Sequence, residues 1–367
     1  MSLKTLLAAS LLSLFSASVL AVPTVTLYGK IDTSILYTHR DMDNGTDSTD
    51  TVSMESGYNL GSRWGLRGTE KIGNVNVGFV LESGIGSDDG TAWQSGRLFG
   101  REAQIHVSGS YGTLYAGRLA TIAGDLGSIQ MLYPVDSAFG NGLVEGVRQG
   151  GSTGLSYGRY DNTLAYMSPT LNGFRAGVMY SFKADQKADA TTRENSGNAK
   201  RYAAGALQYT GANFGLVLAG DYTMYSNAVN PGVDDGYNIL LGGNYNFGPV
   251  QLFAKATYFD NVLDELDTFS VIPSSMPLEG WGAELSAKIP AFGGSFKAAV
   301  GYRSAKDVND SSNKFKRFNV GGAYEYPFSK RTFVYVSAGY AQEKVKSSSG
   351  DYTPNEFQAV LGVNHSF

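Results

Sequence analysis

The sequence predicts an all-β protein whose strands form one large antiparallel sheet. Apolar residues recur at every second position over long stretches, and this is the period of a β-strand. The chain contains 47 Gly and 23 Tyr among 367 residues, so glycine is about 13 % of the chain against an average of about 7 %. Turn motifs separate the alternating stretches.

The first 21 residues are predicted to be a secretory signal peptide. One positive charge, Lys4, precedes an apolar run from Leu6 to about Leu14, and Val19-Leu20-Ala21 fits a signal-peptidase site. The run is too short to span a bilayer as a helix. We therefore divide the chain into a signal peptide, residues 1–21, and a β domain, residues 22–367.

The alternation places charged residues on one face of each strand. In residues 281–289, Trp281 and Leu285 alternate with Glu284 and Lys288. The same pattern recurs in residues 25–35, 63–67, 75–85, 237–247 and 296–303. Each segment therefore has one apolar face and one face that carries polar or charged side chains.

Short and long connections alternate between these strands. Short turns rich in Gly, Pro or Asn lie at 71–74, 110–112, 246–249, 290–294 and 327–330. Longer polar stretches lie at 40–50, 184–199, 260–279 and 343–353. We count about 16 strands, and single-chain outer-membrane barrels have an even number.

A secreted β-sandwich would alternate too, but three features favour a membrane barrel. The strands run about 10 residues, long enough to cross a bilayer at a tilt, whereas soluble strands centre near 5–6 residues. Aromatic residues crowd the strand ends, and charged residues occupy strand centres, which requires a wet interior. In hydrocarbon such a sheet must close on itself, and at this strand number its lumen is an aqueous channel.

Composition excludes several other classes. The chain has no Cys, so it has no disulfide framework, thiol nucleophile or thiolate metal site. Its three His lie far apart in sequence, and no Ser/His pairing motif accompanies His106, so we expect no metal, no cofactor and no enzyme. A formal net charge of −4 argues against a nucleic-acid partner.

Two loop motifs leave alternatives open. The run Asp41–Asp47 faintly resembles a calcium loop, but its glycine falls one place early and Val52 occupies the closing position. It either binds a divalent cation that bridges to lipopolysaccharide phosphates or is a solvated acidic loop. The run Gly150–Gly154 lacks the lysine of a phosphate-binding loop, and we interpret it as a flexible connection.

Five motifs in order carry a resemblance to a known family: Val25–Gly29, Gly61–Glu70, Tyr111–Arg118, Arg159–Pro169 and the ending Gly362–Phe367. Together they resemble the Gram-negative general diffusion porins, particularly the neisserial and β-proteobacterial branch. The resemblance implies a 16-stranded transmembrane barrel in the bacterial outer membrane that assembles as a homotrimer among lipid and lipopolysaccharide. It also implies that small hydrophilic solutes and ions diffuse passively through the barrel. The terminal Phe367 resembles the signal that barrel assembly machinery recognises.

The resemblance further implies that the third extracellular loop folds into the lumen and narrows it. Roughly 40 residues separate the strand ending at Arg118 from the strand containing Thr163, and a loop of this length has a function of its own or is disordered. Within it, Met131–Gly140 looks like the Pro–acid–Phe–Gly tip of porin constriction loops.

The predicted site is an electrostatic constriction, in which fixed charges select ions by sign. The basic candidates on the barrel wall are Lys30, Arg63, Arg118 and Arg148, with Arg159 and Arg67 as second choices. The acidic candidates on the loop are Asp136 and, more weakly, Asp125 and Glu145. Alternation supports Lys30 and Arg63, whereas Arg118 and Arg148 rest on the resemblance.

Basic wall residues outnumber the acidic loop residues, which predicts a mild anion preference. Two alternatives to a general pore stay open. One is a substrate-specific porin with a saturable site, and the other is a structural or adhesive barrel with a closed lumen.

Overall fold

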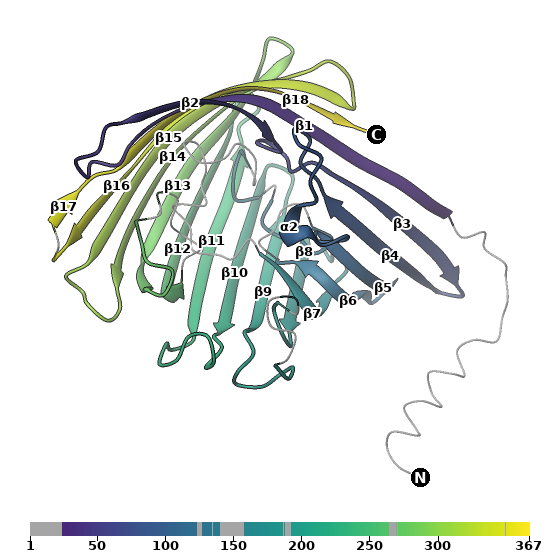
Figure 1. The fold of residues 1–367 in the computed structure, drawn as a ribbon. Coiled ribbons are helices and arrows are strands. Elements are labelled where there is room, and N and C mark those ends of the chain that lie inside the picture. Colours follow the sequence, from purple (N-terminus) through teal and green to yellow (C-terminus); the bar gives the residue numbers. More distant parts are fainter. Residues whose placement is uncertain are drawn as a thin grey trace.

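The computed structural model is almost entirely β-structure (Figure 1). It describes residues 24–122, 127–133, 135–139, 158–185, 187, 192–263, 269, 271–348 and 350–367. The predicted signal peptide, residues 1–21, lies outside the described residues. A four-residue segment, α2 (Trp93–Gly96), is a tight turn in which Gln94 and Ser95 have φ angles of 54° and 62°.

The strands follow one another in chain order. They are β1 (Thr24–Asp41), β2 (Thr49–Ser56), β3 (Arg63–Ile72), β4 (Val75–Gly84), β5 (Glu102–Gly109), β6 (Gly112–Ala120), β7 (Arg159–Met167), β8 (Phe174–Ser181), β9 (Arg201–Thr210), β10 (Phe214–Met224), β11 (Gly236–Asn246), β12 (Gln251–Leu263), β13 (Pro277–Ala291), β14 (Gly294–Asp307), β15 (Lys314–Pro327), β16 (Thr332–Ser347), β17 (Gly350–Tyr352) and β18 (Asn355–Ser366). No helix among the described residues is long and apolar enough to cross a membrane.

The sheet closes into an antiparallel barrel. Outside the two interrupted strands β2/β3 and β17/β18, successive strands pair with one another, and β1 pairs with β18 from Lys30↔Ser366 to Asp41↔Asn355 (Figure 1). β2 and β3 pair with successive halves of β1, and β17 and β18 both pair with β16. The described segments therefore form 16 barrel strands, as predicted. The seam extends to the last residue, because Gly29 and Phe367 exchange two backbone hydrogen bonds of 3.2 and 3.1 Å.

The buried carboxylate of Asp32 binds the segment between β2 and β3, where the chain leaves the sheet. Asp32 accepts hydrogen bonds from the backbone N–H of Leu60 at 3.2 Å, the Tyr335 hydroxyl at 2.8 Å and the Asn364 amide at 2.9 Å. These donors come from the interruption, from β16 and from β18. Because Asp32 is fully buried, this set of donors compensates for the loss of its hydration.

The two faces of the sheet are inverted relative to a soluble protein. On β13, Leu285 is 63 % exposed, whereas its neighbours Glu284 and Ser286 are 2 % and 6 % exposed. The same outward exposure of apolar side chains recurs around the barrel at Leu27, Leu114, Leu164, Leu218, Leu241, Val336 and Leu361. The outer face is thus apolar and the inner face polar, as the alternation predicted.

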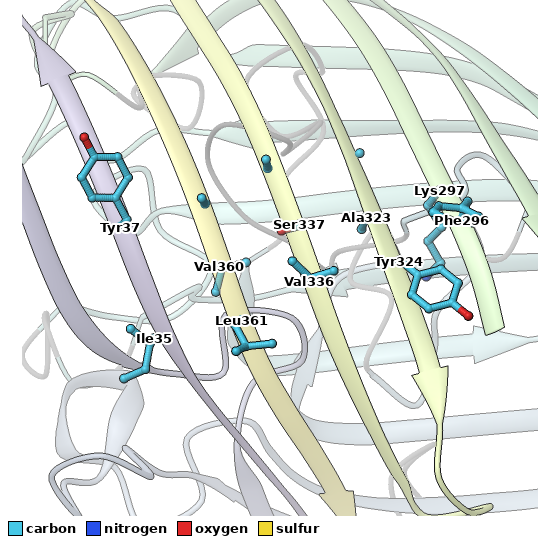
Figure 2. A pocket seen from close by; sticks show the side chains of 13 residues that line it. Ile35, Tyr37, Phe296, Lys297, Ala323, Tyr324, Val336, Ser337, Val360 and Leu361 are labelled. Atoms are coloured by element: carbon cyan, nitrogen blue, oxygen red, sulfur yellow. The ribbon is translucent and has the colours of Figure 1, made fainter. Parts of the chain in front are cut away.

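Small side chains hollow the outer face over β1, β14, β15, β16 and β18. A groove of about 740 Å³ contains Gly322, Ala338 and Ala359. Figure 2 shows Tyr37 on β1 at one side of this groove and Tyr324 on β15 at the other. The outer surface is therefore apolar but not smooth.

The two ends of the barrel differ in their connections. At one end, the turns are short, and β13 and β14 are joined by Phe292 and Gly293, whose φ angles of 51° and 78° match a type I′ hairpin. At the other end the connections are longer, and the longest, residues 121–158, joins β6 to β7. We call these the turn end and the loop end.

Replacing Leu285 with Arg tests whether the apolar outer face contacts lipid. A cation at mid-strand on a lipid-facing surface destabilises a membrane barrel by roughly 2–4 kcal/mol, whereas the cost near an interface is about 0–1 kcal/mol. We expect Leu285→Arg to lower the urea midpoint of the barrel refolded in lipid vesicles, and Phe292→Arg in the turn to leave it nearly unchanged. Equal midpoints for the two variants would contradict the assignment.

Candidate functional site

Charged side chains gather on the inner face of β3–β7. We define the arginine cluster as Arg63, Glu82, Arg97, Arg101, Glu102, Arg118, Arg159 and Asp161. These residues come from neighbouring strands and from the connection that precedes β5. Arg63 and Glu82 alternate with the apolar residues Trp64 and Leu81, whereas Arg118 and Arg159 adjoin the buried Leu119 and Tyr160.

Glu82 on β4 contacts two of these arginines, Arg63 at the start of β3 and Arg101 just before β5. Arg101 Nε donates a hydrogen bond of 2.5 Å to Glu82 Oε1, and Arg63 Nη1 lies 3.9 Å from the same oxygen. Tyr28 on β1 donates to Glu82 Oε2 at 3.0 Å. Arg101 and Glu82 are 3 % and 6 % exposed, so this pair is largely withdrawn from water.

Asp161 holds a second pair. Arg118 Nη1 donates to Asp161 Oδ1 at 2.6 Å, and Arg97 Nη2 lies 3.1 Å from Asp161 Oδ2. Arg118 also donates through Nε to the Gly100 carbonyl at 2.8 Å. Arg159 interacts electrostatically with Arg101, Glu82 and Arg63 of the first group, and it lies two residues before Asp161 on β7. The arginine cluster therefore contains more guanidinium groups than carboxylates.

Lys30 and Arg67 extend the basic wall along β1 and β3. Lys30 is the register partner of Arg63, and the two side chains interact electrostatically. Arg67 is exposed, and its guanidinium lies 5.0 Å from the centre of the Tyr28 ring. The structure thus brings Lys30, Arg63 and Arg159 into one electrostatic neighbourhood, with Arg67 beside it.

Asp136 belongs to a different group of charges. Lys255 Nζ on β12 lies 3.2 Å from Asp136 Oδ2 and 3.6 Å from Glu284 Oε2 on β13. Ser137 donates to Glu284 Oε1 at 3.1 Å. Among the described residues, the ion-pair partner of Asp136 is Lys255 and none of the predicted wall cations. We call Asp136, Lys255 and Glu284 the lysine triad.

Hydrogen bonds attach the described residues 127–133 and 135–139 to several strands. Gln208 on β9 donates to the Met131 carbonyl at 2.8 Å, and Asn244 on β11 donates to the Val135 carbonyl at 2.9 Å. Ser286 on β13 accepts from the Ala138 N–H at 3.1 Å. The contacts thus run from β9 to β13.

Apolar packing supports the same segment. One buried cluster contains Ile129, Met131, Leu132 and Val135 of the segment. It also contains wall residues from β7 to β11: Tyr160, Ala165, Met167, Met179, Tyr202, Ala206, Val217, Ala219 and Leu240. These wall side chains lie on the face that is polar elsewhere in the barrel, so the segment covers an apolar patch of that face.

Several predicted residues are untested by this geometry. Arg148, Asp125 and Glu145, and the run 150–154, lie outside the described residues. In the acidic run, Asp43 accepts a hydrogen bond of 2.7 Å from the backbone N–H of Thr353. No group of three or more His, Asp or Glu side chains that could hold a metal ion occurs in the described part of the chain.

Sequence reasoning missed residues that organise the site, including Glu82, Arg101, Asp161 and Lys255 as partners of the predicted charges. Alternation was the available signal: Lys255 lies between Ala254 and Ala256 in a run of alternating exposure, and Glu82 follows the outward-facing Leu81. Alternation does not show which charged side chains pair with one another across strands.

Replacing Glu82 with Gln tests its role as a shared partner. The change removes the charge that Arg63 and Arg101 share, and we expect a loss of about 1–3 kcal/mol because buried donors lose a charged acceptor. Heat-dependent mobility of the folded barrel in detergent gels measures the loss. Glu70→Gln, at an exposed position of β3, is the control, and an equal shift for both variants would refute the role.

Known proteins are similar to this chain over nearly its whole length. The chain is 34 % identical to an outer membrane porin protein of Bordetella pertussis, over 99 % of this chain and 100 % of that protein. It is 30 % identical to outer membrane porin protein 32 of Delftia acidovorans, over 95 % and 92 %. Among solved structures, an anion-selective porin from Comamonas acidovorans has a TM-score of 0.67 at 24 % identity, covering 94 % of this chain and 100 % of that chain.

The family model described as Gram-negative porin matches residues 8–346. This match agrees with the closed barrel and includes four of the five motifs, from Val25–Gly29 to Arg159–Pro169. The chain therefore belongs to the Gram-negative porin family, as a channel protein of the bacterial outer membrane and not an enzyme.

Proposed function

We propose that this porin forms a water-filled channel for passive diffusion of small hydrophilic solutes and ions, narrowed by an electrostatic constriction. The single observation that carries the proposal is the attachment of residues 127–139 to the inner face, with Asp136 held by Lys255 at 3.2 Å. A segment attached there occupies space that solutes would otherwise use.

The third loop is proposed to fold into the lumen. Two features support this. Its hydrogen bonds reach wall side chains from β9 to β13, and its apolar residues cover the inner face of β7–β11. A loop that stayed at the barrel rim would contact the loop ends of the strands, whereas Gln208, Asn244 and Lys255 lie nearer the turn ends of theirs.

The constriction is proposed to oppose basic wall residues to acidic loop residues. The basic candidates remain Lys30, Arg63, Arg67, Arg118, Arg148 and Arg159, and the acidic candidates remain Asp136, Asp125 and Glu145. The arginine cluster as defined holds five arginines and three carboxylates, and this excess of positive charge supports a mild anion preference. Glu82 and Asp161 hold the guanidinium groups in place and reduce the preference.

Two other functions compete with this proposal. A substrate-specific porin would show saturation by one solute, and an adhesive or structural barrel would conduct nothing. The described inner face favours the general pore. Its charged and amide side chains predominate, and the aromatic rings there do not form a continuous series.

Ion conduction tests the function and the arginines together. In planar bilayers we expect large ohmic steps without saturation, and reversal potentials in a salt gradient that indicate mild anion preference. Arg63→Gln combined with Arg118→Gln should lower the anion-to-cation permeability ratio by about twofold, since two fixed positive charges leave the narrow lumen. Saturation by one solute would support a specific porin, absence of steps would support a closed barrel, and clear cation selectivity of the wild type would refute the anion preference.

An engineered disulfide tests the inserted loop. Ser137 Oγ lies 3.5 Å from Ser286 Oγ, and the natural chain has no cysteine that would compete. We expect Ser137→Cys with Ser286→Cys to form an internal disulfide in the folded barrel, detected by a reductant-dependent gel shift, while conductance changes little. Ser137→Cys with Ser34→Cys on β1 is the control. Equal or absent cross-linking in the two pairs would contradict the proposed position.

Assembly and export form the remaining part of the proposal. We propose a homotrimer, supported by the trimer form of a structurally similar outer membrane protein of Vibrio cholerae, OmpT. We also propose that residues 1–21 are removed as a signal peptide, that Phe367 is read by barrel assembly machinery, and that lipid and lipopolysaccharide surround the barrel. The seam between Gly29 and Phe367 supports a structural need for the last residue.

A further inference from the structure

A second cavity lies at the turn end of the lumen, away from the arginine cluster. Its volume is about 470 Å³, and its walls combine Gln130, Tyr133, Val135, Ser137 and Ala138 with the ends of β8 to β13. Residues of the short turn between β9 and β10 also line it, which places it on the turn side of the β6–β7 segment.

Two cations line this cavity without an ion pair to any described carboxylate. Arg175 on β8 and Lys288 on β13 both line it, and no Asp or Glu is among its described lining residues. Within the described chain neither cation has a carboxylate within 4.0 Å. By contrast Lys297, the register partner of Lys288, pairs with Glu325 at 2.9 Å.

The neutral polar groups of the cavity are held in place. Gln208 and Asn244 are fixed by their hydrogen bonds to the segment, and Gln251 donates to Asn244 Oδ1 at 3.0 Å. These amides make the wall polar without adding charge. The charged side chains among the described lining residues are therefore these two cations, and a concave wall of low dielectric constant strengthens their field.

The number of strands between Arg175 and Lys288 determines whether one molecule can bind both. β8 and β13 are five strand steps apart, so Arg175 and Lys288 are separated by about 24 Å along the wall at about 4.8 Å per step. This is too far for one small molecule to bind both cations. Each cation therefore attracts its own anionic group, within a Debye length of about 10 Å at 0.1 M salt.

We propose that this turn-end cavity is an anion-collecting site for small solutes that carry carboxylate or phosphate groups, with Arg175 and Lys288 each acting as a separate recognition residue for one such group. The inference rests on the proposed open channel but not on the arginine cluster. Lysine and arginine both bind such groups, arginine through its planar fork and lysine as a point charge.

Citrate competition with chloride tests the proposal. Single channels are recorded in 0.1 M KCl, and citrate is added to both sides so that the direction of insertion has no effect. We expect citrate to reduce the wild-type chloride current, and Arg175→Gln with Lys288→Gln to need about tenfold more citrate for the same reduction. The control, Lys316→Gln with Lys344→Gln, loses the same charge at exposed outer-face positions and should behave as the wild type.

The outcomes separate this inference from the proposed function. A wild type that does not conduct refutes the channel itself. A wild type that conducts and is not reduced by citrate refutes the cavity as a site, and so does a conducting double variant reduced as strongly as the wild type. Arg63→Gln with Arg118→Gln should keep the citrate effect, and loss of the effect there would assign it to the arginine cluster. If the double variant does not fold, the two single variants are used, and each should lose part of the effect.

Discussion

The closed ladder of backbone hydrogen bonds is the constraint on which the rest of this structure depends. Hydrocarbon offers no partner to a peptide N–H or C=O, so a sheet in the membrane must have no free edge. Here pairing continues around the sheet from β1 to β18, and β18 pairs back with β1. Closure then separates two environments, and each side chain faces one or the other according to its position in the strand.

The period-two alternation made most of the fold predictable. It located the outward apolar face, the polar inner face and about 16 strands, because each strand repeats the same pattern of exposure. It was weakest where both faces are apolar. Val217 and Leu240 face inward, although Leu216 and Leu241 beside them are exposed on the outer face. An apolar segment of the β6–β7 connection covers the inward pair, and local alternation contains no information about a segment so distant in sequence.

The candidate site was predictable in part for the same reason. Alternation indicates which charges face inward, so Lys30 and Arg63 were identifiable from their own strands. Pairing depends on how the closed sheet brings strands together. Lys255 lies 119 positions from Asp136 in sequence, and only the curvature of the barrel and the path of the connection place them 3.2 Å apart. The lysine triad and the Glu82 contacts therefore depend on the tertiary structure, and local sequence alone does not predict them.

The seam also has a consequence for the order of folding. It joins residues from opposite ends of the chain, so closing it costs more chain entropy than any hairpin between successive strands. Hairpins can form locally, whereas the seam must wait for the final strand. Until then both margins of the sheet expose unpaired peptide groups and can join to another molecule. The chain is therefore at greatest risk of aggregation while its sheet is still open, and this risk does not depend on the stability of the closed barrel.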